Sequence, residues 1–169
     1  MDATAAAVQQ TYAAWVQAIG SILAIVAAFI VASRQSAAAR EQRITELKER
    51  LDAIAEMLLH ASKAVSEFHA NAKSCKEVMS LVFPATSKVT AARIATTAVK
   101  EISTSDITRA RVVVALIKAK TAIANTEGNW PMPAGDFHVG WFDAIDGLQR
   151  HLFDAHLEVK SEADKTGKR

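Results

Sequence analysis

The longest apolar run of the chain lies near its amino terminus, over residues 13–33, and reads AAWVQAIGSILAIVAAFIVAS. No charged residue occurs from Ala3 to Ser33. A helix needs roughly 20 mostly apolar residues to cross the hydrocarbon core of a bilayer. The run contains about nine Ile, Leu, Val or Phe residues, and each favours insertion by roughly 0.3–0.6 kcal/mol at the bilayer centre. The pattern therefore predicts one transmembrane helix over residues 13–33, preceded by a short leader over residues 1–12.

Two other kinds of segment have a similar pattern. A secretory signal peptide has a cationic start, an apolar core of about 7–15 residues and a small-residue cleavage site. Here the leader carries Asp2 and no Lys or Arg, and the run is too long, although residues 31–33 and 37–39 resemble cleavage sites. The other alternative is a fully buried helix of a soluble protein, and a chain of this size has little mass to surround one on every side.

The charges that flank the run predict its orientation. Arg34, Arg40 and Arg43 follow it closely, whereas the leader has only Asp2. Lys and Arg are enriched on the cytoplasmic side of membrane spans. We therefore expect an extracytoplasmic leader and a cytoplasmic domain over residues 34–160. Lipid-recognition clusters hold about four to eight cations, so setting the topology is enough to explain these arginines.

The apolar run also carries a resemblance to known proteins. Residues 15–22 read Trp-Val-Gln-Ala-Ile-Gly-Ser-Ile and lead into an Ala/Ile/Val stretch followed by Arg34-Gln35. This segment resembles the anchor of many uncharacterised small bacterial inner-membrane proteins. The resemblance covers the anchor alone and names no activity. It implies a bacterial or prophage origin and a single-pass location in the inner (plasma) membrane with the amino terminus outside.

Small residues recur at every fourth position within the predicted span, at Gly20, Ala24, Ala28 and Ala32. This spacing forms one smooth seam along a helix, which lets another backbone approach closely. Two residues beside the seam, Gln17 and Ser21, can hydrogen-bond across such an interface. The pattern favours self-association, and the alternative is an Ala-rich span without a partner. A pore has little support, because no charge or continuous polar stripe crosses the run.

A heptad repeat begins after the span and continues almost to Pro84, with no Pro or Gly in between. Its strongest apolar positions are Ile44, Leu47, Leu51, Ile54, Leu58, Val65 and Phe68. A sustained repeat of 3.5 residues indicates packed, supercoiled helices. Further apolar residues widen the stripe, which is typical of a helix with more than one neighbour. We interpret the repeat first as part of an intramolecular bundle and second as a homo-oligomeric coiled coil. The helix can leave the membrane unbroken.

The remaining patterns predict shorter helices. Proline disfavours helix in the residue before it, so the long helix over residues 36–83 is expected to end at Pro84. Apolar spacing then predicts helices from about 87 to 102, 106 to 125 and 137 to 160, with caps at residues 103–106 and at Asp136. Residues 161–169 are charged and are expected to be a disordered tail. The fold class is therefore all-α: an N-terminal transmembrane helix followed by a long heptad-patterned helix and a cytoplasmic antiparallel helical bundle.

Aromatic residues concentrate around one proline-rich loop, which includes Trp130, Pro131, Pro133 and Trp141. Two interpretations follow from this concentration. Either the loop caps the end of the bundle, which we favour, or it presents aromatic anchors to a partner protein. The proline pair stiffens the loop in both cases.

The amino-acid composition supports a helical protein and reduces the range of partners that we expect. Of the 169 residues, 50% are hydrophobic but only 6% aromatic, with few Gly and Pro. The formal net charge of +2 gives no strong field, so nucleic acid is not an expected partner. The single Cys75 leaves no intrachain disulfide and fits a reducing compartment.

Neither the histidines nor the cysteine predicts a reactive site. His151 and His156 are five residues apart, roughly 140° around a helix, and Asp154 faces away from both. Two ligands on one helix need a spacing of three or four residues to share a metal. Cys75 occupies a core position of the heptad and is interpreted as a small buried thiol. We expect no enzyme activity, no metal and no cofactor.

These observations predict a membrane-anchored, non-enzymatic scaffold or sensor that acts through self-association and protein–protein interaction. Its expected partners are the lipid bilayer, further copies of itself and a protein that the sequence does not identify. A prophage- or defence-associated role is compatible with the anchor resemblance. The alternatives are a small pore-forming or membrane-perturbing protein and a spanin-like envelope linker whose long helix lies in the periplasm.

Overall fold

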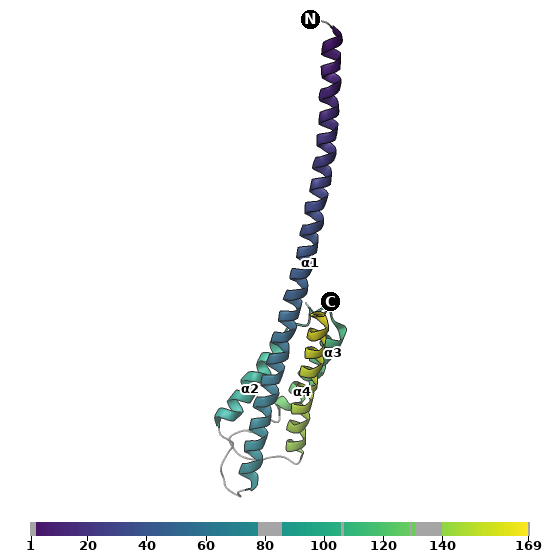
Figure 1. The fold of residues 1–169 in the computed structure, drawn as a ribbon. Coiled ribbons are helices and arrows are strands. Elements are labelled where there is room, and N and C mark those ends of the chain that lie inside the picture. Colours follow the sequence, from purple (N-terminus) through teal and green to yellow (C-terminus); the bar gives the residue numbers. More distant parts are fainter. Residues whose placement is uncertain (1–2, 78–85, 106, 129, 131–139, 169) are drawn as a thin grey trace. The chain divides into compact units, whose positions relative to one another are not determined.

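The computed structural model describes residues 3–77, 86–105, 107–128, 130 and 140–168. All regular structure within these ranges is helical, with no strand among them, which confirms the all-α prediction. The helices are α1 (Ala3–Glu77), α2 (Thr86–Glu101), α3 (Ala110–Glu127) and α4 (Trp141–Thr166) (Figure 1).

The chain divides into two compact units, Met1–Thr45 and Glu46–Arg169. α1 contributes to both, because its 75 residues extend across the division. In the first unit, every side chain that the structure describes, from Tyr12 to Thr45, is exposed. The folded domain was expected to begin at residue 34, and the second unit begins twelve residues further along the chain, at Glu46.

The second unit has a hydrophobic core to which all four helices contribute. The largest fully buried side chains of this core are Leu51, Leu58, Val65, Phe68, Val99, Val112, Leu116, Ile123, Ile145, Leu148, Leu152 and Val159. On α1, α3 and α4 these residues recur at spacings of three, four or seven, so each of these helices turns one apolar stripe towards the same interior.

Within the second unit, α4 packs along α1 in the opposite direction. The contacts that establish this join Asp52 to Lys160, Ala55 to His156, Ser62 to Gln149, and Phe68 to Trp141. Residue numbers rise along α1 as they fall along α4, which defines an antiparallel pair. Figure 1 shows the yellow-green α4 beside this part of α1.

The other two helices complete the core. α3 also runs antiparallel to α4, since Arg109, just before α3, bonds Glu162 near the end of α4, and Asn125 near the end of α3 lies beside Ala144. α2 is tied to α1 by the Lys88–Glu67 salt bridge. Its last turn is tied to the end of α3 through Lys100 and Glu127.

The last helix differs from its predicted bounds at both ends. It begins at Trp141 because Gly140, just before it, has a φ of 89°, a conformation that glycine adopts most readily. It ends at Thr166, so the expectation of a disordered tail from residue 161 is wrong over most of its length. Ala163 continues the apolar stripe one turn after Val159 and is fully buried, which holds this last turn on the core.

The third helix begins at Ala110, later than the expected start at residue 106. The Ser103 and Ser105 hydroxyl groups hydrogen-bond each other instead of capping a helix. Ile107 is buried in the connecting segment, and Arg109 precedes the helix in an extended conformation. The predictions for residues 78–85, including Pro84, and for 131–139, including Pro131, Pro133 and Asp136, lie outside the described residues.

Replacing Phe68 by Ala tests the core. Phe68 is fully buried and contacts two tryptophan rings, so Phe68→Ala is expected to lower the free energy of unfolding by about 3–5 kcal/mol through cavity formation. Urea denaturation of the detergent-solubilised protein, followed by far-ultraviolet circular dichroism, measures this loss. The control Met57→Ala removes a partly exposed side chain from the same helix and should stay within about 0.5 kcal/mol of wild type. Equal effects of the two substitutions would contradict this account of the core.

Candidate functional site

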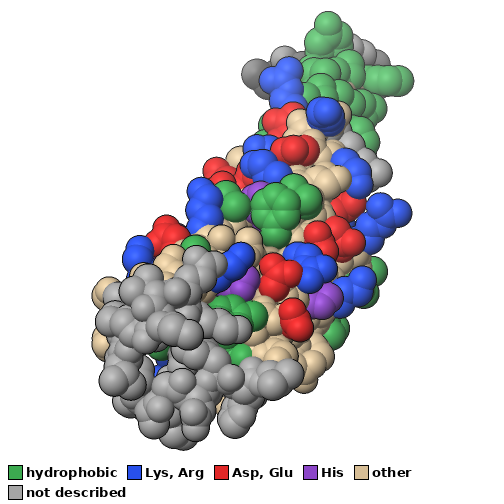
Figure 2. All heavy atoms as spheres, turned by 90° about the horizontal axis from the view of Figure 1, so that it is seen from below, with side chains coloured by type: hydrophobic (Ala, Val, Ile, Leu, Met, Phe, Trp, Pro, Cys, Tyr) green, Lys and Arg blue, Asp and Glu red, His purple; other side chains and the backbone are tan. Residues whose placement is uncertain are grey.

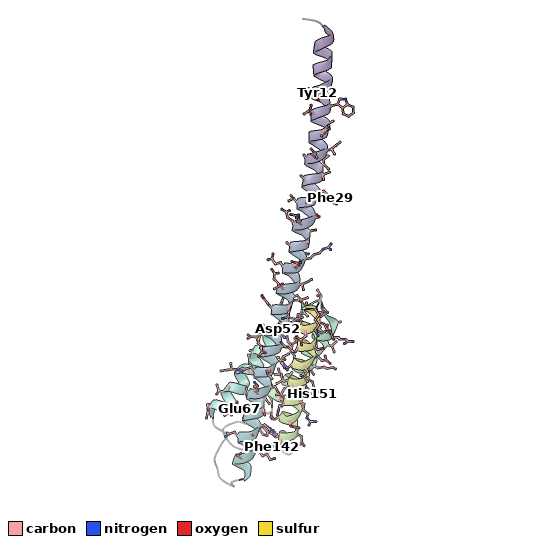
Figure 3. The ribbon with its side chains drawn as sticks, in the orientation of Figure 1. Tyr12, Phe29, Asp52, Glu67, Phe142 and His151 are labelled. Atoms are coloured by element: carbon pink, nitrogen blue, oxygen red, sulfur yellow. The ribbon has the colours of Figure 1, made fainter. Side chains whose placement is uncertain are left out.

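The apolar residues of the first unit surround α1 on all sides. Ile22, Leu23, Ile25 and Val26 point in different directions around the helix, and each side chain is 49–69% exposed. Tyr12 and Phe29 also project from the helix and are 75% exposed (Figure 3). A helix that is apolar on every face requires an apolar environment on every face. This segment is the one candidate membrane span within the described residues.

The small-residue seam lies within this exposed segment. A Cβ atom at Gly20 would meet nothing within 4 Å, and Ala24, Ala28 and Ala32 are exposed. The Ser21 hydroxyl donates to the Gln17 carbonyl oxygen at 2.8 Å, so its proton is satisfied inside the helix. The seam is thus open to a second helix, and self-association through it stays a prediction.

The three arginines that follow the apolar run are all exposed on α1. None of the three, Arg34, Arg40 and Arg43, forms a salt bridge with another described residue. Their charges therefore remain available to the surroundings of the helix. Figure 2 shows how different the second unit is: blue and red side chains are interspersed over its visible surface.

The heptad residues have two different environments. Ile44 is 39% exposed and Leu47 is half-buried, whereas Leu51, Ile54, Leu58, Val65 and Phe68 are buried. The buried members contact the other helices of the same chain. A homo-oligomeric coiled coil through this stripe would have to displace α4 from it.

The two tryptophans of the predicted loop region lie against the core. Phe68 contacts both Trp130 and Trp141, with ring centroids 5.4 and 5.5 Å apart. Trp141 is only 4% exposed and meets Phe68 edge to face, an arrangement that aromatic pairs favour. Trp141 is therefore a core residue and is not available as an anchor for a partner. Trp130 is half-buried on the same ring, which also fits the capping interpretation.

One charged cluster ties the beginning of α3 to the end of α4. The Arg109 guanidinium donates to Glu162 Oε2 and to Thr166 Oγ1, both at 3.1 Å. Lys165 donates to the other carboxylate oxygen of Glu162 at 2.7 Å. The Lys165 hydrogen bond, with contributions from Arg109 and Arg111, holds the pKa of Glu162 below its usual range. This carboxylate, whose side chain is only 11% exposed, is ionised and paired at neutral pH.

A second cluster joins α1 to α4. Asp52 accepts from Lys160 at 2.8 Å and from Lys48 at 3.2 Å (Asp52 is labelled in Figure 3). The hydrogen bonds from Lys160 and Lys48 lower the pKa of Asp52, and Asp52 in turn raises the pKa of Lys160. These groups hold two helices together, so their shifted pKa values have a structural explanation.

The histidines and the cysteine are dispersed. His156 Nδ1 lies 2.8 Å from the Ala55 carbonyl oxygen, between α4 and α1, whereas His151 lines the surface between α3 and α4. No group of three or more His, Cys, Asp or Glu residues suited to a metal ion occurs in the described part of the chain. Cys75 belongs to α1, and its side chain lies outside the described residues.

Sequence reasoning missed the Arg109–Glu162 cluster, although a signal for it exists. The buried stripe of α4 continues to the end of the helix at helical spacing, through Val159, Glu162, Ala163 and Thr166. A charged residue on such a stripe indicates a buried ion pair with a neighbouring helix. Its partner Arg109 lies in a connecting segment, where helical periodicity gives no information. In the comparisons with known proteins, the chain matches no family model, no curated protein and no solved structure.

Glu162→Gln tests the charged cluster. Because its pKa is lowered in the folded protein, Glu162 contributes stability that is fully present above the ordinary glutamate pKa of about 4.3 and is lost as the pH falls through the lowered value. We expect Glu162→Gln to lower the free energy of unfolding by about 1–3 kcal/mol at pH 7. The difference from wild type should shrink as the pH is lowered below about 4.

Urea denaturation at several pH values measures this difference. The matched control is Glu158→Gln, one turn earlier on α4 at an exposed position without a salt bridge among the described residues. The control should stay within about 0.5 kcal/mol of wild type. A Glu162→Gln effect that persists undiminished in acid would contradict the ionic explanation.

Proposed function

We propose that the chain is a single-pass membrane protein whose residues 13–33 cross the bilayer. The observation that supports this most directly is the apolar surface around α1 from Tyr12 to Val31, all of it exposed in the protein itself. Burying apolar surface contributes roughly 25 cal/mol per Å², and lipid tails would cover every face of this helix at once. Gln17 and Ser21 are the main polar interruptions, and the Ser21 hydroxyl is already hydrogen-bonded within the helix.

The orientation is proposed from the flanking charges. Arg34, Arg40 and Arg43 remain exposed and unpaired with other described residues, as cations at a membrane surface would be. The positive-inside rule then places the leader outside and the second unit in the cytoplasm of a bacterial cell.

The cytoplasmic part is proposed to be an antiparallel helical bundle that acts as a non-enzymatic scaffold or sensor. Both α1 and α3 run against α4 around one core, which supports the bundle architecture. The carboxylates with the clearest pKa shifts, at Asp52, Glu67 and Glu162, all pair with lysine or arginine across helix contacts. These pairs give the shifted carboxylates a structural role, which fits a protein that acts by recruiting another protein.

Membrane anchoring is tested by two arginine substitutions. Ile22→Arg together with Val26→Arg adds a cost of about 2.5–3.5 kcal/mol per charge at the bilayer centre, which exceeds the insertion energy of the run. We expect wild-type protein in the pellet after alkaline carbonate extraction of bacterial membranes, and the double variant in the supernatant. The control pair Ile22→Leu and Val26→Leu should stay in the pellet. Extraction of wild-type protein by carbonate would overturn the proposal.

Enzyme fusions to the wild-type chain, expressed in bacteria, test the orientation. A carboxy-terminal β-galactosidase fusion should be active and an alkaline phosphatase fusion inactive. The opposite result would place the second unit in the periplasm and favour the spanin-like envelope linker.

Self-association through the seam is a separate prediction. In a Cys75→Ser background, Ala28→Cys should form disulfide-linked dimers in native membranes, because the small-residue face allows close approach. Adding Gly20→Leu should reduce this trapping at least about fivefold, a loss of about 1 kcal/mol. The control Ala18→Leu makes a similar enlargement on the opposite side of the helix and should leave trapping unchanged. Equal loss from both substitutions would argue against a specific seam.

A further inference from the structure

The outer face of α3 and α4 carries an apolar surface that the core does not use. Val114 and Ile117 on α3, and Leu157 on α4, are each 48–52% exposed. Shallow hollows lie between these two helices, and Val114 and Leu157 border the same one. We call these three residues, with the hollows that they border, the α3–α4 face. Unlike the apolar surface of the first unit, it covers one side of a folded unit and has charged neighbours.

Charges of opposite sign line the two edges of these hollows. Arg111 and Lys118 come from α3, whereas Asp154 and Glu158 come from α4. All four are exposed, and none forms a salt bridge with another described residue. By contrast, Arg109, Glu162 and Lys165, which lie close by, are paired with one another. The α3 edge is therefore basic and the α4 edge acidic.

This arrangement is complementary to itself. A two-fold axis parallel to the helices, placed over the hollows, brings α3 of one copy opposite α4 of a second copy at the same level. Val114 then faces the second copy's Leu157, because the two border one hollow. Arg111 of one copy faces Glu158 of the second copy, because these two residues also border one hollow. Lys118 faces the second copy's Asp154, because Lys118 and Asp154 border another hollow. Each contact occurs twice, as an isologous interface requires.

We infer that the α3–α4 face binds a second copy of this chain. A two-fold axis along the helices keeps the Glu46 ends of both copies pointing the same way, as two chains anchored in one bilayer need. Three apolar side chains per copy are few for a stable dimer in solution. Confinement to one membrane raises the effective concentration towards the millimolar range, where such a contact forms. The inference therefore rests on the proposed anchor, while the surface itself belongs to the second unit.

Disulfide trapping of the full chain tests the pairing. Two single-cysteine proteins, Val114→Cys and Leu157→Cys, each in a Cys75→Ser background, are reconstituted together in phosphatidylethanolamine–phosphatidylglycerol vesicles and oxidised. Ile94→Cys replaces Val114→Cys in the control, because Ile94 is an apolar residue of α2 that is 65% exposed. We expect the 114–157 crosslink to form at least about tenfold faster than the 94–157 crosslink, as specific pairing of close residues gives high effective concentration. Equal rates of the two crosslinks would overturn the inference. The inference would also be overturned if the Val114→Cys protein alone formed a 114–114 crosslink as fast as the 114–157 crosslink forms.

A charge exchange tests the complementarity independently. Lys118→Glu and Asp154→Lys, each added to both trapping partners, should slow the 114–157 crosslink at least about fivefold, since like charges then face each other. The two substitutions together should restore the wild-type rate, because each edge again meets an opposite charge. Unfolding curves of all three variants should match wild type, since these side chains are exposed. Failure of the double exchange to restore the rate would overturn the proposed two-fold arrangement.

The closing control separates this inference from the proposed anchor. Carbonate extraction is performed on every sample, so release of the protein refutes the anchor by itself. Released protein is then trapped in solution at about 1 mM, which replaces the concentration that the membrane would provide. A 114–157 crosslink there supports the α3–α4 face without the anchor, and its absence refutes the face.

Discussion

The antiparallel packing of α4 on the second half of α1 is the interaction on which the folded unit depends. A stripe of apolar side chains between Leu51 and Ala72 on α1 is buried, and α4 contributes its own apolar residues to the same core. Ion pairs such as Asp52–Lys160 set the register of the two helices. α2 and α3 contribute further residues to the same core. Without the packing of α4, the stripe on α1 would need a different cover, such as a second chain.

Periodicity in the sequence accounts for much of this architecture. It predicted the helical segments and the buried stripe from Leu51 to Phe68, because a run of evenly spaced apolar residues has few other ways to leave water. Whether the span and the long helix are continuous was left open, and α1 joins them in one helix. Periodicity did not predict where helices start and stop. Those limits depend on single backbone conformations, such as the left-handed Gly140, and on partners distant in sequence, such as Arg109 with Glu162. No local pattern contains either kind of information.

The tryptophans allowed two interpretations, bundle capping, which we favoured, and anchoring of a partner, and the sequence could not decide between them for a related reason. Trp141 was considered as an anchor for a partner, because aromatic residues near prolines are common at interfaces. Its ring instead packs edge to face on Phe68, more than seventy residues away in the sequence. The choice between core and interface depends on which residue lies opposite, and only the three-dimensional structure shows that. The heptad was ambiguous in the same way, because its pattern does not show whether a helix of the same chain or a second chain covers it. In the structure, α4 covers it.

The position of α4 at the end of the chain also determines the order of events during synthesis. Ribosomes add about 5–20 residues per second, so Trp141 is made about 4–15 s after Phe68. For that interval the apolar stripe of α1 has no permanent cover, although the apolar run before it has already left the ribosome. The proposed anchor would therefore reach the bilayer while the unit behind it is still unfolded. Nascent chains that stop before α4 would display the bare stripe at the membrane surface, where chaperones and proteases recognise such surfaces.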